Sequence, residues 1–113
     1  NEWDVTRRNT FESNIGYTTP VGKYSPRGDS PYGIADMSGN VWEWCQSKFK
    51  LYPYRDDGRE DLQGDERRVV RGGSWFYYQW RCRAAYRPGG TPLDFNDLLG
   101  FRLALSPIKF LDS

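Results

Sequence analysis

The sequence predicts a loop-rich domain in which a small antiparallel sheet supports long connecting segments. Twelve glycines and seven prolines among 113 residues imply many turns and few long regular elements. Only 37% of the residues are hydrophobic although 17% are aromatic, so burial has to be concentrated in a few large rings. Three short segments in the second half of the chain also have the composition of strands.

The first half of the chain is expected to consist mainly of turns. Glycine and proline recur throughout residues 1–35. The segment 36–50, which holds two tryptophans, is predicted to be a short helix or a run of turns. Residues of both charges predict a long solvated loop over 52–66.

The second half is expected to supply the sheet. Strands are predicted over 67–71, 81–87 and 100–105, because β-branched or alternating residues there are bounded by glycine and proline. Short connections between successive strands favour antiparallel pairing. The loops 73–80 and 88–99 would then emerge from related regions of the sheet, and loops held by such a scaffold often carry binding residues.

Composition excludes several functional classes. Sixteen basic and 15 acidic residues give a net charge of only +1, so the chain lacks the large positive charge that favours nucleic-acid binding. No apolar run approaches the ~20 residues of a membrane span. Histidine is absent, and Cys45 and Cys82 cannot form a zinc site alone. The two cysteines would form a disulfide in an oxidising compartment, or else be two buried thiols.

Three motifs occur in a specific order along the chain. They are YGIADMSGNVWEW at 32–44, RVVRGGSW at 68–75 and GFR at 100–102. This set resembles the C-terminal half of the formylglycine-generating enzyme family, the sulfatase-modifying-factor domain. The resemblance implies an irregular α+β domain with a C-type-lectin-like fold. It also implies that residues 1–113 are the C-terminal portion of one such domain, with an N-terminal portion as a partner.

The same resemblance bears on catalysis. The enzymes of the family hold copper with two cysteines that follow the Gly-Gly-Ser motif. Counted from Ser74, the first position here is Tyr77 and the second is Cys82; counted back from Arg87, the second is Gln79. Cu(I) is selected by soft thiolate ligands, and Tyr77 supplies none at the first position. We therefore expect no copper and no enzymatic activity. The related sulfoxide synthases bind iron through histidines on another domain, so no iron is expected either.

A calcium ion is the one metal that the resemblance implies. Family members bind structural calcium where this chain has Asn40 and Glu43, with the backbone carbonyls near Gly39 and Val41. Oxygen ligands of this kind suit a hard cation. The alternative is that Asn40 and Glu43 bond only to local backbone and to an arginine.

The remaining motif residues are expected to be structural. Tryptophans inside tight motifs usually pack, so core positions are predicted for Trp42, Trp44, Trp75 and Trp80. Ion or cation–π networks are predicted for Arg71, Arg87 and Arg102. The Ser74 hydroxyl has no neighbouring base and is expected to bond to turn backbone groups.

The chain looks especially similar to the variable proteins of diversity-generating retroelements, in which positions between a fixed Gly-Gly-Ser-Trp and a fixed Gly-Phe-Arg are diversified. The residues expected to contact a ligand are Phe76, Tyr77, Tyr78, Arg81, Tyr86, Asp94, Asn96 and Asp97. Aromatic rings with adaptable polar neighbours resemble antibody loops in composition. The alternative is that the rings complete a small hydrophobic core.

These expectations favour a non-catalytic module that binds a protein ligand. The resemblance also suggests a bacterial or phage origin, with the protein either cytoplasmic or displayed on a surface. Two alternatives stay open. One is an enzyme, or a subunit, of the sulfatase-modifying or sulfoxide-synthase type that the N-terminal portion completes. The other is a structural domain of a larger signalling or defence protein.

Overall fold

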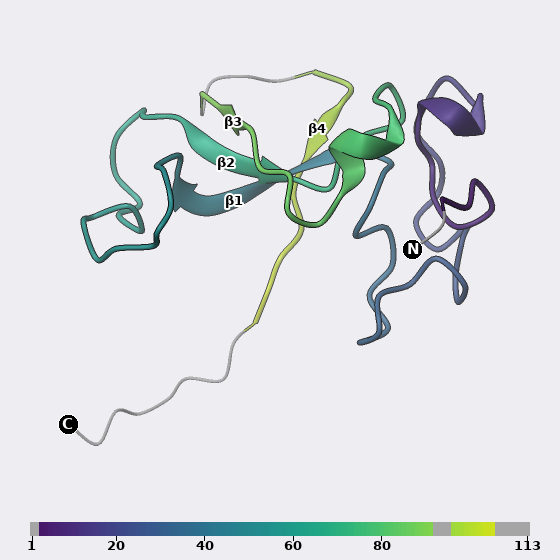
Figure 1. Ribbon diagram of the computed structural model, residues 1–113, viewed down its shortest axis with the longest axis horizontal. Coiled ribbons are helices and arrows are strands. Elements are labelled where there is room, and N and C mark those ends of the chain that lie inside the picture. Colours follow the sequence, from purple (N-terminus) through teal and green to yellow (C-terminus); the bar gives the residue numbers. More distant parts are fainter. Residues whose placement is uncertain (1–2, 92–95, 106–113) are drawn as a thin grey trace.

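A computed structural model describes residues 3–91 and 96–105, and most of them lie in loops around a small curved sheet (Figure 1). The regular elements in chain order are the 3-10 helix η1 (Phe11–Ser13), strands β1 (Trp42–Lys48) and β2 (Arg68–Arg71), the 3-10 helix η2 (Gln79–Cys82), and strands β3 (Gly89–Gly90) and β4 (Leu99–Gly100). The described residues contain no helix that could span a lipid bilayer.

The sheet has four strands in the order β3-β2-β1-β4. The central strands β1 and β2 are antiparallel, with Glu43 opposite Arg71 and an irregularity before Lys48. Strand β3 is antiparallel to β2, whereas β4 is parallel to β1, with Trp42 opposite Leu99. The predicted small sheet is therefore confirmed, and it is mixed because its last strand runs parallel to β1.

The predicted elements differ from the observed ones in three places. The strand predicted over 67–71 is confirmed as β2. The segment 36–50 begins in turns, but its second half forms β1, because pairing with β2 decides its conformation. The strand predicted over 81–87 is wrong: η2 and a turn occupy this segment, and the strand follows as β3. Of the strand predicted over 100–105, only Gly100 is paired, since no described strand lies beside 101–105.

The apolar core is small. Its buried hydrophobic residues are Trp42, Val69, Val70 and Cys82. The prediction that tryptophans form the core is right for Trp42, whereas Trp44 and Trp75 are half-buried. Fully enclosed polar side chains (Asn9, Thr10 and Ser74) complete the interior. Hydrogen bonds between segments therefore hold together much of an interior that aliphatic contacts hold together in other domains.

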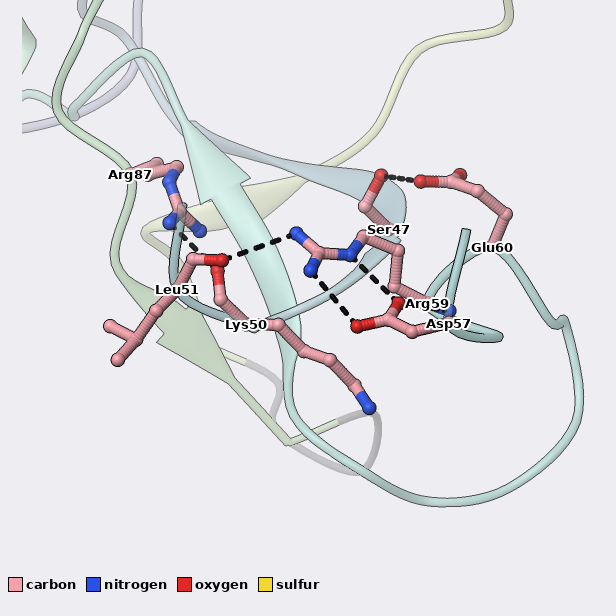
Figure 2. Close-up of polar contacts among 7 residues, drawn as sticks. All are labelled: Ser47, Lys50, Leu51, Asp57, Arg59, Glu60 and Arg87. Carbon is pink, nitrogen blue, oxygen red and sulfur yellow. Dashed lines mark hydrogen bonds and ion pairs between the residues drawn. The ribbon is translucent and has the colours of Figure 1, made fainter. Parts of the chain in front are cut away.

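The long polar loop after β1 is held by one buried arginine. Figure 2 shows the Arg59 guanidinium between the Asp57 carboxylate and the Leu51 carbonyl oxygen. Its Nε and Nη2 donate to Asp57 at 2.9 and 3.0 Å, and its Nη1 donates to Leu51 at 3.4 Å. The Ser47 hydroxyl on β1 donates to the Glu60 carboxylate. Arg87 donates to the Lys50 carbonyl at 2.7 Å, which ties the segment before β3 to the end of β1.

This anchor predicts a defined acid sensitivity. The hydrogen bonds from Arg59 lower the pKa of Asp57 to about 2. Because the folded-state pKa lies below the unfolded value, the stabilisation is present above about pH 4 and is lost as the pH falls towards 2. We expect Asp57→Asn to flatten this part of the stability curve in denaturant titrations. An acid limb identical to that of the wild type would contradict the assignment.

Candidate functional site

The two longer sequence motifs interlock through their main chains. Gly39 N donates to Gly72 O at 2.6 Å, and Trp75 N donates to Asn40 O at 2.8 Å. Asn40 N in turn donates to Asn9 O at 2.8 Å. Gly39 and Gly72 have φ values of 88° and 98°, a region that side chains strongly disfavour. The glycines of the motifs are thus required where the two segments meet.

The segment that follows these glycines is a loop held by backbone atoms. We call residues 74–82 the aromatic loop. Tyr77 N donates to Ser74 O at 3.2 Å, and Phe76 N donates to Ser74 Oγ at 3.3 Å. The prediction that the buried Ser74 hydroxyl serves the turn is confirmed. Phe11 N donates to Tyr77 O at 3.0 Å, which fixes the middle of the loop against η1.

The second half of the aromatic loop is fixed from two sides. The Glu12 carboxylate accepts from Gln79 N at 2.7 and 3.0 Å, immediately before the turn of η2. The Ser38 hydroxyl donates to Cys82 O at 2.9 Å. Sequence reasoning missed Glu12 and Ser38, since their partners lie 67 and 44 residues away and leave no local signal.

Three large rings of the aromatic loop face solvent. Phe76 and Tyr78 are each 54% exposed and Trp80 is 49% exposed, and we call these three residues the display surface. The prediction that Trp80 is a core residue is wrong, because its ring lies against Tyr86 at 5.8 Å instead of entering the interior. Tyr78 contacts Phe11 at 4.6 Å between ring centroids.

Two of the predicted contact residues, Tyr77 and Tyr86, contact both the display surface and the buried Trp42. Tyr77 is half-buried, and its ring packs edge-to-face with the buried Trp42 indole at 5.5 Å between ring centroids. The Tyr86 ring centroid lies 5.9 Å from that of the same indole. The Arg81 guanidinium lies 4.9 Å from the Tyr77 ring and 4.8 Å from the Trp80 ring. These cation–π contacts stiffen the loop and leave Arg81 half-exposed beside it.

The second predicted loop reaches the first through one contact. Trp75 Nε1 donates to Asp97 O at 3.3 Å, so the segment around Asn96 and Asp97 lies near the start of the aromatic loop. Both side chains are exposed, and Asn96 Oδ1 accepts from Leu98 N at 2.8 Å. Asp94 lies outside the described residues.

The three motif arginines occupy structural networks, as predicted. Arg71 donates to the Ala84 carbonyl at 2.6 Å. Arg87 lies 4.0 Å from the Tyr52 ring. Arg102 donates to the carbonyl oxygens of residues 35 and 36 at 2.7 and 2.9 Å, besides its ion pair with a glutamate of β1. The last motif is therefore bound to the first.

The residues expected to bind calcium have other partners. The Asn40 side chain accepts from Thr19 N at 3.0 Å and donates to Thr19 O at 3.2 Å. Both Glu43 carboxylate oxygens accept from Arg102, one of them at 2.7 Å. As these side chains lie, they do not fit a calcium shell that includes Gly39 and Val41 carbonyls. In the described ranges, no group of three or more acidic, histidine or cysteine side chains is arranged so that it could hold a metal ion.

Both cysteines are free thiols. Cys82 is buried against Gly73 and Tyr78, and desolvation raises its pKa to about 11. Cys45 on β1 is half-buried, and burial raises its pKa as well. Since the thiolate is the reactive and metal-binding form, Cys82 is a poor ligand in this environment.

The Cys82 environment predicts slow alkylation. At neutral pH we expect iodoacetamide to modify Cys82 roughly 100-fold more slowly than in the denatured chain, because so little thiolate is present. Peptide mapping by mass spectrometry measures this rate, with Cys45 as the internal comparison. Because the folded pKa is raised, the stabilisation is complete below about pH 9 and is lost as the pH rises towards 11. Rapid modification of folded Cys82 would contradict its burial.

Comparison with known proteins gives a consistent result. A family model described as the sulfatase-modifying factor enzyme 1-like domain matches residues 1–107. The formylglycine-generating enzyme of Streptomyces coelicolor is 37% identical over 102 residues, covering 85% of this chain and 32% of that enzyme. Serine/threonine-protein kinase pkn1 of Chlamydia pneumoniae is 37% identical over 108 residues, covering 91% of this chain and 16% of the kinase.

A solved structure extends the likeness to the fold. Treponema denticola variable protein 1 matches with a TM-score of 0.69 and 29% identity, over 85% of this chain and 34% of that protein. The match confirms the irregular, C-type-lectin-like fold that the sequence motifs imply. The chain spans about a third or less of each of these three proteins.

Proposed function

Because this chain belongs to the sulfatase-modifying factor enzyme 1-like family, we propose that it keeps the scaffold of that family for recognition rather than catalysis. In this proposal the module binds a protein ligand through the display surface. The half-buried Arg81 and Tyr86 and the exposed Asp97 border the contact. Its likeness to Treponema denticola variable protein 1 supports a loop surface of this kind.

One observation carries the proposal: the aromatic loop is fixed by its backbone while its largest rings remain exposed. The bonds from Phe11 N to Tyr77 O and from Tyr77 N to Ser74 O do not depend on the side chains at 76–78. A loop held in this way keeps its shape when its exposed side chains change. Preorganised aromatic side chains also lose little rotamer entropy on binding.

The chemistry of the loop disfavours copper catalysis. Tyr77 stands at the first of the two expected thiolate positions and packs on the buried Trp42. Cys82 remains at one of the two alignments for the second position, but its raised pKa keeps it protonated. A single protonated thiol supplies none of the soft anionic ligands that select Cu(I).

The binding test uses a ligand obtained by panning the wild-type chain against displayed protein fragments from its source genome. We expect Phe76→Ala and Tyr78→Ala each to weaken binding by roughly 10-fold or more. Their melting temperatures should stay within about 2 °C of the wild type, since both rings are half-exposed. Tyr32→Ala is the matched control, because Tyr32 is exposed and lies outside the aromatic loop. Unchanged affinity in both loop variants would contradict the display surface.

An enzyme or enzyme subunit completed by an N-terminal portion is the competing function. A Cu(I) titration against a chelator of known affinity separates the two. We expect no tight site, and Cys82→Ala should leave the titration curve unchanged. A tight Cu(I) site that Cys82→Ala abolishes would favour the enzyme.

The expected bacterial or phage origin, and the cytoplasmic or surface location, remain predictions.

A further inference from the structure

A cavity of about 890 Å³ lies beside the aromatic loop, on the side of η2. Its walls include three arginines and two tryptophans: Arg8, Arg71, Arg83, Trp3 and Trp80. The main chain at Gly72 and Cys82 forms part of the same lining. The volume lies within the range of pockets that bury a ligand group.

The cavity is strongly cationic for a chain of nearly balanced charge. No aspartate or glutamate lines it. Arg8 donates to the Ser38 hydroxyl at 3.3 Å and lies 4.8 Å from the Trp3 ring. Arg71 donates to the Ala84 carbonyl oxygen and to a tyrosine hydroxyl. In the described part of the chain, none of the three guanidinium groups contacts a carboxylate.

One carboxylate beside the cavity already has a hydrogen-bond partner, the lining residue Gln79. The Glu12 carboxylate influences Cys82, as Arg8 does, but both of its oxygens accept from Gln79 N. Three cations around a partly enclosed space repel one another unless an anion lies between them. Guanidinium groups bind carboxylates in a directed, often bidentate manner, and the indoles provide flat apolar walls.

The cavity continues into the display surface. Gln79 and Trp80 line the cavity, and the exposed Trp80 ring also belongs to the display surface. Resting on the proposed function, we propose that the cavity receives an acidic, carboxylate-bearing segment of the same protein ligand, while an apolar part of that ligand covers Phe76 and Tyr78. Charge complementarity selects the acidic segment, and the shared wall selects a ligand that reaches both sites.

The test uses a fluorescein-labelled peptide of six glutamates flanked by two tyrosines, measured by anisotropy with the full chain. We expect saturable binding to the wild type, at least 10-fold weaker binding to Arg83→Gln, and no binding of the matching glutamine peptide. Arg55→Gln is the matched control, because Arg55 is exposed and lies outside the cavity lining. Arg8→Gln provides a second variant from the cavity lining.

Several outcomes would overturn the inference. Equal binding of the glutamine peptide would remove the role of charge, and equal loss in Arg55→Gln would indicate unspecific attraction. Binding of ATP without binding of the peptide would assign the cavity to a small anion. If Tyr78→Ala abolishes binding of the panned ligand but Arg83→Gln does not, the cavity proposal fails while the proposed function stands. If the peptide binds through Arg83 but the display-surface variants have no effect, the proposed function fails and the cavity remains an acidic-peptide site.

Discussion

Replacing Gly73 by alanine is expected to destabilise the fold by roughly 3 kcal/mol or more. Gly73 is buried with φ 73°, a conformation that alanine disfavours. The added methyl would also collide with the Cys82 sulfur and crowd the Cys82 Cα at 3.0 Å. Thermal or denaturant unfolding measures the loss.

Gly33→Ala is the matched control for this prediction. Gly33 has a similar φ of 79°, but a methyl group there would meet nothing within 4 Å. We expect it to cost roughly 1 kcal/mol, the conformational part alone. In the double variant Gly73→Ala with Cys82→Ala, removal of the sulfur should recover part of the loss. Equal effects of the two glycine substitutions would show that the packing of Cys82 on Gly73 contributes nothing.

Replacing Asn40 by alanine is expected to cost roughly 2–4 kcal/mol. Its amide satisfies both Thr19 N and Thr19 O in the interior, and its φ is 70°. Asn40→Gly keeps the conformational freedom and loses only the hydrogen bonds, so it should fall between the wild type and Asn40→Ala. Unfolding curves of the three proteins separate the two contributions. Equal stability of all three would contradict the role of this side chain.

Asn40 also provides a test of whether the chain binds calcium. With the Asn40 amide held by Thr19 and Glu43 held by Arg102, we expect calcium and EDTA to give the wild type the same melting temperature. A calcium-dependent increase that Asn40→Gly removes would mean that these side chains leave their partners to bind the ion.

The motifs made the fold family and the turn at Gly72 and Gly73 predictable from the sequence, because glycine at these points is a local requirement. The strands were less accessible. Strand β3 consists of two glycines and exists only through its partner β2, which no local preference encodes. The segment 42–48 has a composition that suits several conformations, and its antiparallel partner decides between them.

The candidate site was predictable in part for similar reasons. The exposure of Phe76 and Tyr78 agrees with the expected contact residues, and the composition of the loop was the signal. The exposure of Trp80 was missed, because a tryptophan in an aromatic cluster is usually buried. The cationic cavity was missed as well, since Arg8, Arg71 and Arg83 are distant in sequence and only the fold brings them together.

The central claim is that a fixed scaffold presents side chains that can change. The DNA that encodes the chain tests this claim most directly. We expect a near-copy of the codons for residues 72–102 beside the gene, with adenines at codons of the contact residues such as Phe76 and Tyr78. The codons for Gly73, Ser74 and Cys82 should be identical in both copies. Absence of a near-copy, or differences concentrated in the codons of these buried residues, would contradict the account.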